Sequence, residues 1–203
     1  MATPVGHYLL GLSIAQAFAK DETERKRAFW LGNVGWLPDL DFLPGFLLGD
    51  VGLFHRGATH SLLGAVVFAI VAVLVLRMLK WRMSARLFLA LCLIFASHSV
   101  LDFFGQDSVP PSGVSLLWPW TREVFQSPWL IFPDAPHTIA SLISLHTLVL
   151  LIQETLVLAP LNGLIFVVKG WPHPRPKTAA WLYGGWFLLA TAVSILAMRE
   201  GWL

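Results

Sequence analysis

Two ionisable residues interrupt an otherwise apolar stretch near the middle of the chain. His98 and Asp102 stand at the end of an apolar run over residues 85–104. Ionisable side chains inside a membrane segment are costly unless they are paired, hydrated or bound to a metal. Their i, i+4 spacing places both on one face of a helix, about 6 Å apart along its axis. The pair therefore predicts a cation site, with a hydrogen-bonded packing pair as the alternative.

Two histidines and an arginine stand together directly before another apolar run. Residues 55–61 read His-Arg-Gly-Ala-Thr-His-Ser. Imidazole is the commonest protein ligand for zinc and its relatives, and the guanidinium of Arg56 can fork onto a phosphate. We expect Gly57 to provide backbone freedom and Thr59 to cap the next helix. The alternative is an interfacial anchor whose side chains reach the lipid headgroups.

Two carboxylates, Asp39 and Asp41, flank a single leucine at the end of a short apolar stretch. This arrangement can bridge or chelate a hard cation. One carboxylate would then be a ligand and the other a general base, and the pattern does not assign the roles. An Asx turn after Pro38 is the alternative. His7, near the start of the first helix, is equally compatible with an interfacial or a core histidine.

The composition places these residues in a membrane protein. The 203 residues are 56% hydrophobic and 13% charged, and the mean hydropathy is +0.68. We expect an all-α polytopic protein of about six helices, with one domain over residues 1–203. Pro160 and Gly163 are expected to break or kink one helix. The runs predict four spans, at 62–79, 85–104, 138–168 and 178–198, and two shorter helices, at 4–19 and 27–37.

The basic residues set the predicted topology, because most of them fall between apolar runs. Basic loops stay in the cytoplasm, so both termini are expected outside. The positive balance thus reports topology, and we expect no nucleic-acid partner. Eleven of the 14 Lys and Arg residues form three clusters: Lys20, Arg25, Lys26 and Arg27; Arg77, Lys80, Arg82 and Arg86; Lys169, Arg175 and Lys177.

This topology gathers the potential ligands at one membrane face. The single cysteine, Cys92, lies inside an apolar run, so no thiolate site is expected. A His and Asp set suits zinc best, with manganese as the second choice, and one to three ions. We predict catalytic roles for Asp39, Asp41 and Arg56, and His137 could join the site. The predicted metal ligands are His7, Asp39, Asp41, His55, His60, His98 and Asp102.

In their order, these motifs resemble the YdjM-like family of LexA-regulated, inner-membrane, metal-dependent hydrolases. A more distant similarity is to zinc-dependent phospholipase C and the single-strand nucleases. It implies ligands at His7, one of Asp39 and Asp41, His55, His98 and Asp102. The chain differs downstream, where His146 is followed four residues later by Leu150 rather than a carboxylate. The family resemblance lies within residues 1–120 and rests on His7 and segments 37–41, 55–61, 98–102 and 113–119.

A hydrolase of the extracytoplasmic face of the inner membrane is the predicted function. A metal centre at the lipid–water boundary favours an ester or phosphoester of a lipid-like substrate, with membrane lipids as partners. One alternative is a metal-ion or proton transporter, which would place polar residues through the midplane and toward both faces. Another is a non-catalytic membrane sensor. The oligomeric state is not indicated.

Overall fold

The computed structural model describes residues 2–48, 55–108, 110, 112–135, 143–170 and 176–202. Within these residues every named element is a helix, so the all-α prediction is confirmed. The six predicted helices correspond to α1, α2 with its extension η1, α4, α5, α6 and α7, while α3 is an additional short helix. The elements are α1 Pro4–Phe18, α2 Glu22–Leu31, η1 Gly32–Asp41, α3 Phe42–Leu48, η2 Ala58–His60, α4 Leu62–Met78, α5 Ala85–Phe103, α6 Leu145–Val168 and α7 Lys177–Arg199, where η marks a 3-10 helix.

Three helices, α5, α6 and α7, are long and apolar enough to cross a membrane. They confirm three of the four predicted spans. The fourth, α4, is apolar but has only 17 residues. At about 1.5 Å per residue it reaches roughly 26 Å, slightly less than a hydrocarbon core of about 30 Å. A thinned or locally adapted bilayer would still accommodate it.

The sequence predicted a break or a kink at Pro160 and Gly163. Helix α6 continues through both residues, so it has no break there. Proline removes the backbone donor that would bond to the Leu156 carbonyl, without ending the helix here. Two residues further on, the Asn162 amide donates to the carbonyls of Leu9 (3.1 Å) in α1 and Leu158 (3.4 Å) in α6, and so links α6 to α1. The predicted start of this run, at residues 138–142, lies outside the described residues.

The predicted helix over 27–37 is divided differently. Helix α2 begins at Glu22, because the carboxylate of Asp21 caps its first turn by accepting a hydrogen bond from the Glu24 amide at 2.8 Å. The chain then tightens into η1, which packs its backbone directly on α1. A Cβ atom on Gly35 would lie 2.5 Å from the carbonyl oxygen of His7. Glycine therefore permits the close contact that brings Asp39 and Asp41 toward α1.

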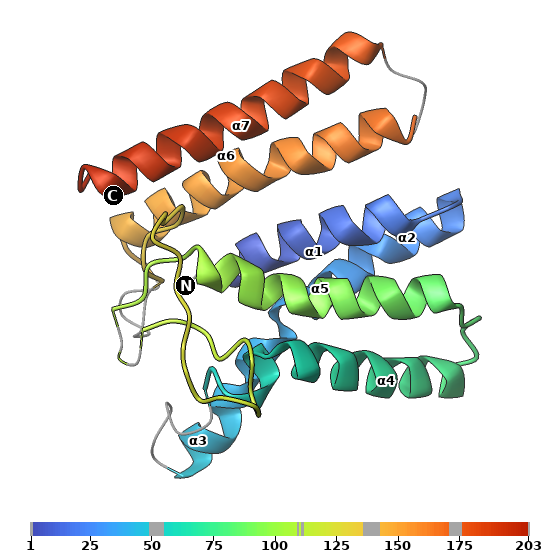
Figure 1. Ribbon diagram of the computed structural model, residues 1–203. Coiled ribbons are helices and arrows are strands. Elements are labelled where there is room, and N and C mark those ends of the chain that lie inside the picture. The colour runs from blue at the N-terminus through green and yellow to red at the C-terminus, as the bar shows by residue number, and fades with distance from the viewer. Residues whose placement is uncertain are drawn as a thin grey trace.

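The helices form one bundle around α1 and α5 (Figure 1). The pair α6 and α7 lies on one side of α1, and α4 lies on the far side of α5. The connection after α5 folds back over the end of this helix, since the amides of Ser127 and Ile131 donate to the carbonyls of Phe103 and Phe104, both at 2.8 Å. One end of the bundle thus holds the starts of α1, α4 and α6 and the end of α5.

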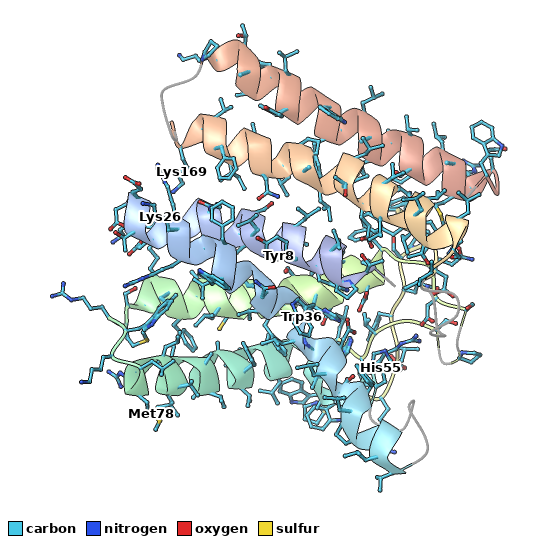
Figure 2. All side chains as sticks on the ribbon, turned by 180° about the vertical axis from the view of Figure 1, so that it is seen from behind. Tyr8, Lys26, Trp36, His55, Met78 and Lys169 are labelled. Atoms are coloured by element: carbon cyan, nitrogen blue, oxygen red, sulfur yellow. The ribbon has the colours of Figure 1, made fainter. Side chains whose placement is uncertain are left out.

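The basic clusters meet at the opposite end. Figure 2 shows Lys26, Met78 and Lys169 at that end and His55 at the other. Arg25 donates to the Lys169 carbonyl at 3.3 Å, and the Lys169 ammonium donates to the Ala19 carbonyl at 3.2 Å. Such grouping is what a common cytoplasmic side for these loops requires. The side itself stays a prediction, and residues 171–175, with Arg175, lie outside the described part.

Candidate metal centre

Four of the predicted ligands form a compact group. Each of Asp39, His60, His98 and Asp102 offers one ligand atom, and these atoms lie within 4.8 Å of one another. They come from three elements, η1, η2 and α5. The side chains of His60, His98 and Asp102 are fully buried, whereas 23% of the Asp39 side chain is exposed. The group therefore opens to its surroundings on the Asp39 side.

The spacing within this group fits a tetrahedral metal site. His98 Nε2 lies 3.0 Å from Asp102 Oδ2 and 3.3 Å from Asp39 Oδ1. His60 Nε2 lies 3.6 Å from Asp39 Oδ1 and 3.7 Å from Asp102 Oδ2. In a tetrahedral zinc site with bonds of about 2.0–2.1 Å, neighbouring ligand atoms are roughly 3.3 Å apart. The four side chains could bind such an ion with small adjustments.

Hydrogen bonds fix the tautomers of the two central histidines. His98 Nδ1 faces the Gly35 carbonyl at 2.9 Å, and His60 Nδ1 faces the Thr59 hydroxyl at 3.1 Å and Asp41 Oδ2 at 3.2 Å. Carbonyl and carboxylate oxygens only accept hydrogen bonds, and the Thr59 hydroxyl already donates its hydrogen to Asp41, so both Nδ1 atoms carry hydrogen. In the neutral imidazoles both Nε2 atoms then present lone pairs, and these atoms are only 3.0 Å apart. Two facing lone pairs require a cation or a shared proton between them.

The charge of the site also favours a cation. Asp39, Asp41 and Asp102 contact histidines, but no Lys or Arg side chain forms an ion pair with any of them among the residues that the structure describes. Buried carboxylates are costly without a compensating charge. A divalent metal at the group would supply that charge and would use the two Nε2 lone pairs. The residues present thus fit a zinc-type ion.

His7 lies directly against this group. Its ring stacks on that of His98, with 3.8 Å between centroids and 19° between planes. Its Nε2 atom is 3.5 Å from Asp102 Oδ1, and neither ring nitrogen has a hydrogen-bond partner although the residue is buried. Buried polar atoms are normally satisfied. An unpartnered imidazole beside four potential ligands supports a fifth ligand position at His7.

Asp41 occupies a different position from Asp39. Its Oδ1 atom accepts a hydrogen bond from His55 Nδ1 at 2.7 Å, and its Oδ2 atom accepts one from the Thr59 hydroxyl at 2.5 Å. Burial acts to raise the pKa of Asp41, but the hydrogen bonds from His55 and His60 outweigh it and hold the pKa below its ordinary value. Asp41 therefore stays a carboxylate that orients His60 from behind. The predicted capping role of Thr59 is wrong, since Ser61 caps α4.

Asp41, His55 and His60 form a second group whose ligand atoms also lie within 4.8 Å. The two groups share His60. A neutral imidazole has one lone pair, so His60 can serve one ion through Nε2 or another through Nδ1, but not both. Because Nδ1 is already bonded to Asp41, the Nε2 side is the better ligand. The geometry favours one ion per chain, at the lower end of the predicted one to three.

Arg56 is directed away from the central group. Its backbone has a φ of 66°, in the left-handed region, and its amide donates to Asp41 Oδ2 at 3.2 Å. The guanidinium forms a buried ion pair with Asp107, which also accepts a hydrogen bond from the Gly113 amide at 2.9 Å. The predicted phosphate-binding role is not tested by this arrangement and stays a prediction. The contacts themselves favour a role in holding the 55–61 loop against the 105–135 connection.

This contact predicts a stability effect for Arg56→Ala. Removing one partner of a buried pair costs about 3–5 kcal/mol, because the other charge is left uncompensated. We expect Arg56→Ala and Asp107→Ala each to lower the free energy of unfolding by that amount, measured by denaturant titration in detergent. The double variant should lose clearly less than the sum. Unchanged stability of Arg56→Ala would instead leave the guanidinium available for a substrate.

Glu154 is a residue of the site region to which sequence reasoning gave no such role. This fully buried carboxylate of α6 accepts hydrogen bonds from the amides of Thr3 (2.5 Å) and Gly6 (3.1 Å) and from the Thr3 hydroxyl. It thereby holds the first turn of α1, directly before His7. Glu154 therefore makes a buried polar contact between α6 and α1. The side chains of His146 and Gln153, in the same helix, instead bind carbonyls of the 105–135 connection.

Seven predicted ligands are therefore placed at one end of the bundle. Asp39, His60, His98 and Asp102 form the central group, His7 stacks on it, and Asp41 and His55 lie behind His60. Their function as ligands stays a prediction. His137 lies outside the described residues.

Fold and site together define a helical membrane protein with a buried His and Asp group able to hold a metal ion. The chain belongs to the YdjM inner membrane protein family, whose family model matches residues 1–202. It is similar to the inner membrane protein YbcI of Escherichia coli strain K12, with 32% identity over 145 residues, which cover 69% of this chain and 80% of the relative. No solved structure matches. The predicted family is confirmed, and the match extends beyond residue 120.

Proposed function

We propose that this chain is a membrane-bound, metal-dependent hydrolase of an ester or phosphoester bond in a lipid-like substrate. The observation that carries the proposal is the pair of Nε2 atoms of His60 and His98, which face each other at 3.0 Å between two carboxylates. Zinc suits this donor set best and manganese second. When bound, such an ion supplies Lewis acidity and lowers the pKa of a coordinated water.

Different residues of the site would bind the ion, contact the substrate and orient the ligands. His60, His98 and Asp102 would hold the ion, because they are buried and their partners fix their orientation. Asp39 has the most exposed side chain of the central group and so faces an incoming substrate. We assign to Asp39 the contact with the reacting groups, as a ligand or as the base that accepts a proton. Asp41, with both oxygens engaged, would orient His60.

The surroundings of the group favour a lipid-like substrate. Helix α3 begins directly after Asp41 and exposes Phe42, Leu43, Leu47 and Leu48. An apolar surface of this kind beside a polar centre offers contact to acyl chains while a headgroup reaches the carboxylates. By the basic-loop rule this end of the bundle faces the extracytoplasmic side. Substrate from the outer leaflet of the inner membrane would therefore meet Asp39 first.

A transporter would need polar sites distributed toward both faces. Within the described residues, both His and Asp groups lie at one end of the bundle. At the other end, the buried Gln16 side chain in α1 donates a hydrogen bond to the Arg25 carbonyl in α2 at 3.1 Å. This polar group is therefore used in packing α1 against α2. This distribution favours hydrolysis at a surface over passage through the bundle.

The proposed activity is testable with the full chain in lipid vesicles. We expect hydrolysis of a short-chain phospholipid or a polyprenyl phosphate, loss of that activity to background after chelation, and recovery with zinc or manganese. The readout is released headgroup or phosphate. His146→Ala is a suitable control, because the His146 imidazole bonds to the Asp134 carbonyl at 2.8 Å and lies outside both His and Asp groups among the described residues. Metal-dependent ion uptake by the vesicles without hydrolysis would establish the transporter instead.

A further inference from the structure

A hollow lies at the basic end of the bundle, opposite to the His and Asp groups. It measures about 540 Å³ when its open mouth is included. Three arginines from separate elements line it: Arg27 from α2, Arg82 from the α4–α5 connection and Arg86 from α5. Its lining also includes the apolar side chains of Phe18 and Leu87. A hollow with arginines above an apolar surface matches an amphiphile with an anionic head.

The residues that line this hollow carry more positive than negative charge. Among the described residues, none of its three arginines forms an ion pair, and its one acidic residue is Glu24, whose carboxylate accepts a hydrogen bond from the Lys20 amide at 2.8 Å. The ammonium group of Lys169 adds a further positive charge close to Arg86 and Arg25. Burial lowers the pKa of Lys169, and the positive charges of Arg86 and Arg25 lower it further. An anion bound here would relieve this repulsion.

Aromatic rings hold two of the arginines in place. The guanidinium of Arg27 lies 4.7 Å from the centre of the Trp81 ring, and that of Arg86 lies 6.0 Å from the centre of the Phe18 ring. Cation–π contacts of this kind orient the planar guanidinium and leave its N–H groups available. Those N–H groups match phosphate oxygens, to which arginine donates in a forked geometry.

We propose that this hollow binds one anionic phospholipid from the leaflet at the basic end of the bundle. The phosphate would contact Arg82 and Arg86, and an acyl chain would lie against Phe18 and Leu87. Two properties favour a lipid over free phosphate: the apolar lining of the hollow, and its position beside apolar helices at a membrane boundary. The site is separate from the proposed hydrolytic centre, so it stands whether or not the chain is a hydrolase.

Binding of dioctanoyl phosphatidylglycerol to the full chain in detergent, measured by native mass spectrometry, tests this site. Arg82→Gln and Arg86→Gln should each weaken binding about fivefold, and the double variant about 25-fold. Arg77→Gln is the matched control, because Arg77 is an exposed arginine of the same end that does not line the hollow. It should bind like the wild type. Dioctanoyl phosphatidylcholine, which has no net charge, should bind at least fivefold more weakly than phosphatidylglycerol.

Two outcomes would overturn the proposal. If Arg77→Gln weakens binding as much as Arg86→Gln, the lipid responds to surface charge in general. If inorganic phosphate competes as effectively as the lipid does, the hollow is a phosphate site.

Leu87→Trp gives a variant that keeps all three arginines, and it should reduce lipid binding by filling the apolar part of the hollow. The thermal melting temperature of each variant in detergent checks its folding.

Discussion

His98→Ala is expected to lower the affinity for the bound metal by about 100- to 1000-fold. Structural zinc with four ligands binds with about 10–16 kcal/mol, so one ligand contributes roughly 2.5–4 kcal/mol. His98 is at the centre of the group, within 3.3 Å of three other potential ligand atoms. The dissociation constant, measured by competition with a chelating dye in detergent, should rise accordingly. Asp102→Ala should behave in the same way, and hydrolysis should fall to background in both.

The protein should remain folded in these variants, because removal of an ionisable group from a membrane helix removes a desolvation cost that offsets part of the loss of its buried partner. His146→Ala provides the control, since it deletes a histidine at the start of α6 that lies outside the group. It should retain both metal and activity. Wild-type affinity in His98→Ala would exclude His98 as a ligand and with it the proposed centre.

Asp39 and Asp41 should respond differently to replacement by asparagine. Asp39→Asn removes a negative ligand from the central group, and we expect a loss of metal affinity of about 100-fold or more together with loss of turnover. Asp41→Asn removes the carboxylate that accepts from His60 Nδ1, and replacing such an orienting partner costs about 10- to 100-fold in metal affinity or activity. Dye competition and metal stoichiometry distinguish the two variants.

The number of ions bound by the wild type and by Asp41→Asn distinguishes a single metal centre from two separate ones. With a single centre, the wild type and Asp41→Asn both hold one ion per chain at saturating metal. Two ions in the wild type and one in Asp41→Asn would show that Asp41, His55 and His60 hold an ion of their own. His60 would then have to bind through Nδ1, which is opposed by the tautomer that its contacts indicate.

The sequence alone predicted the helices and the convergence of ligand types. Apolar runs define α5 and α7 to within one residue at either end, because a run of about 20 mainly apolar residues is the length that crosses a membrane. The positions of Lys and Arg predicted which helix ends lie together, and the structure groups His7, Asp39, His60 and His98 at one end. The membrane topology predicted from Lys and Arg therefore indicates a site that no single motif would identify.

The roles within the site could not be predicted in the same way, because they depend on contacts between distant segments. The separation of Asp39 from Asp41 depends on which face of η1 meets η2. The tautomer of His98 depends on the Gly35 carbonyl, which the close packing of η1 on α1 places within 2.9 Å. Asp107 stands in an irregular connection and has no pattern that would mark it as the partner of Arg56.

The break or kink predicted around Pro160 shows the limit of a local rule. Proline removes one backbone donor, yet α6 continues through Pro160 to Val168 and packs against both α1 and α7. Contacts with α1 also give Glu154 its role at the start of that helix, which the sequence of α6 alone does not indicate.

Metal analysis of the wild-type protein, purified in detergent without chelators, decides whether the facing histidines hold a metal or share a proton. We expect about one zinc or manganese ion per chain, with X-ray absorption showing nitrogen and oxygen ligands at about 2.0–2.2 Å and no sulfur. A protein that contains no divalent metal, and that binds none when zinc is added, would contradict the metal centre. The 3.0 Å contact between His60 and His98 would then be a hydrogen bond that serves packing alone.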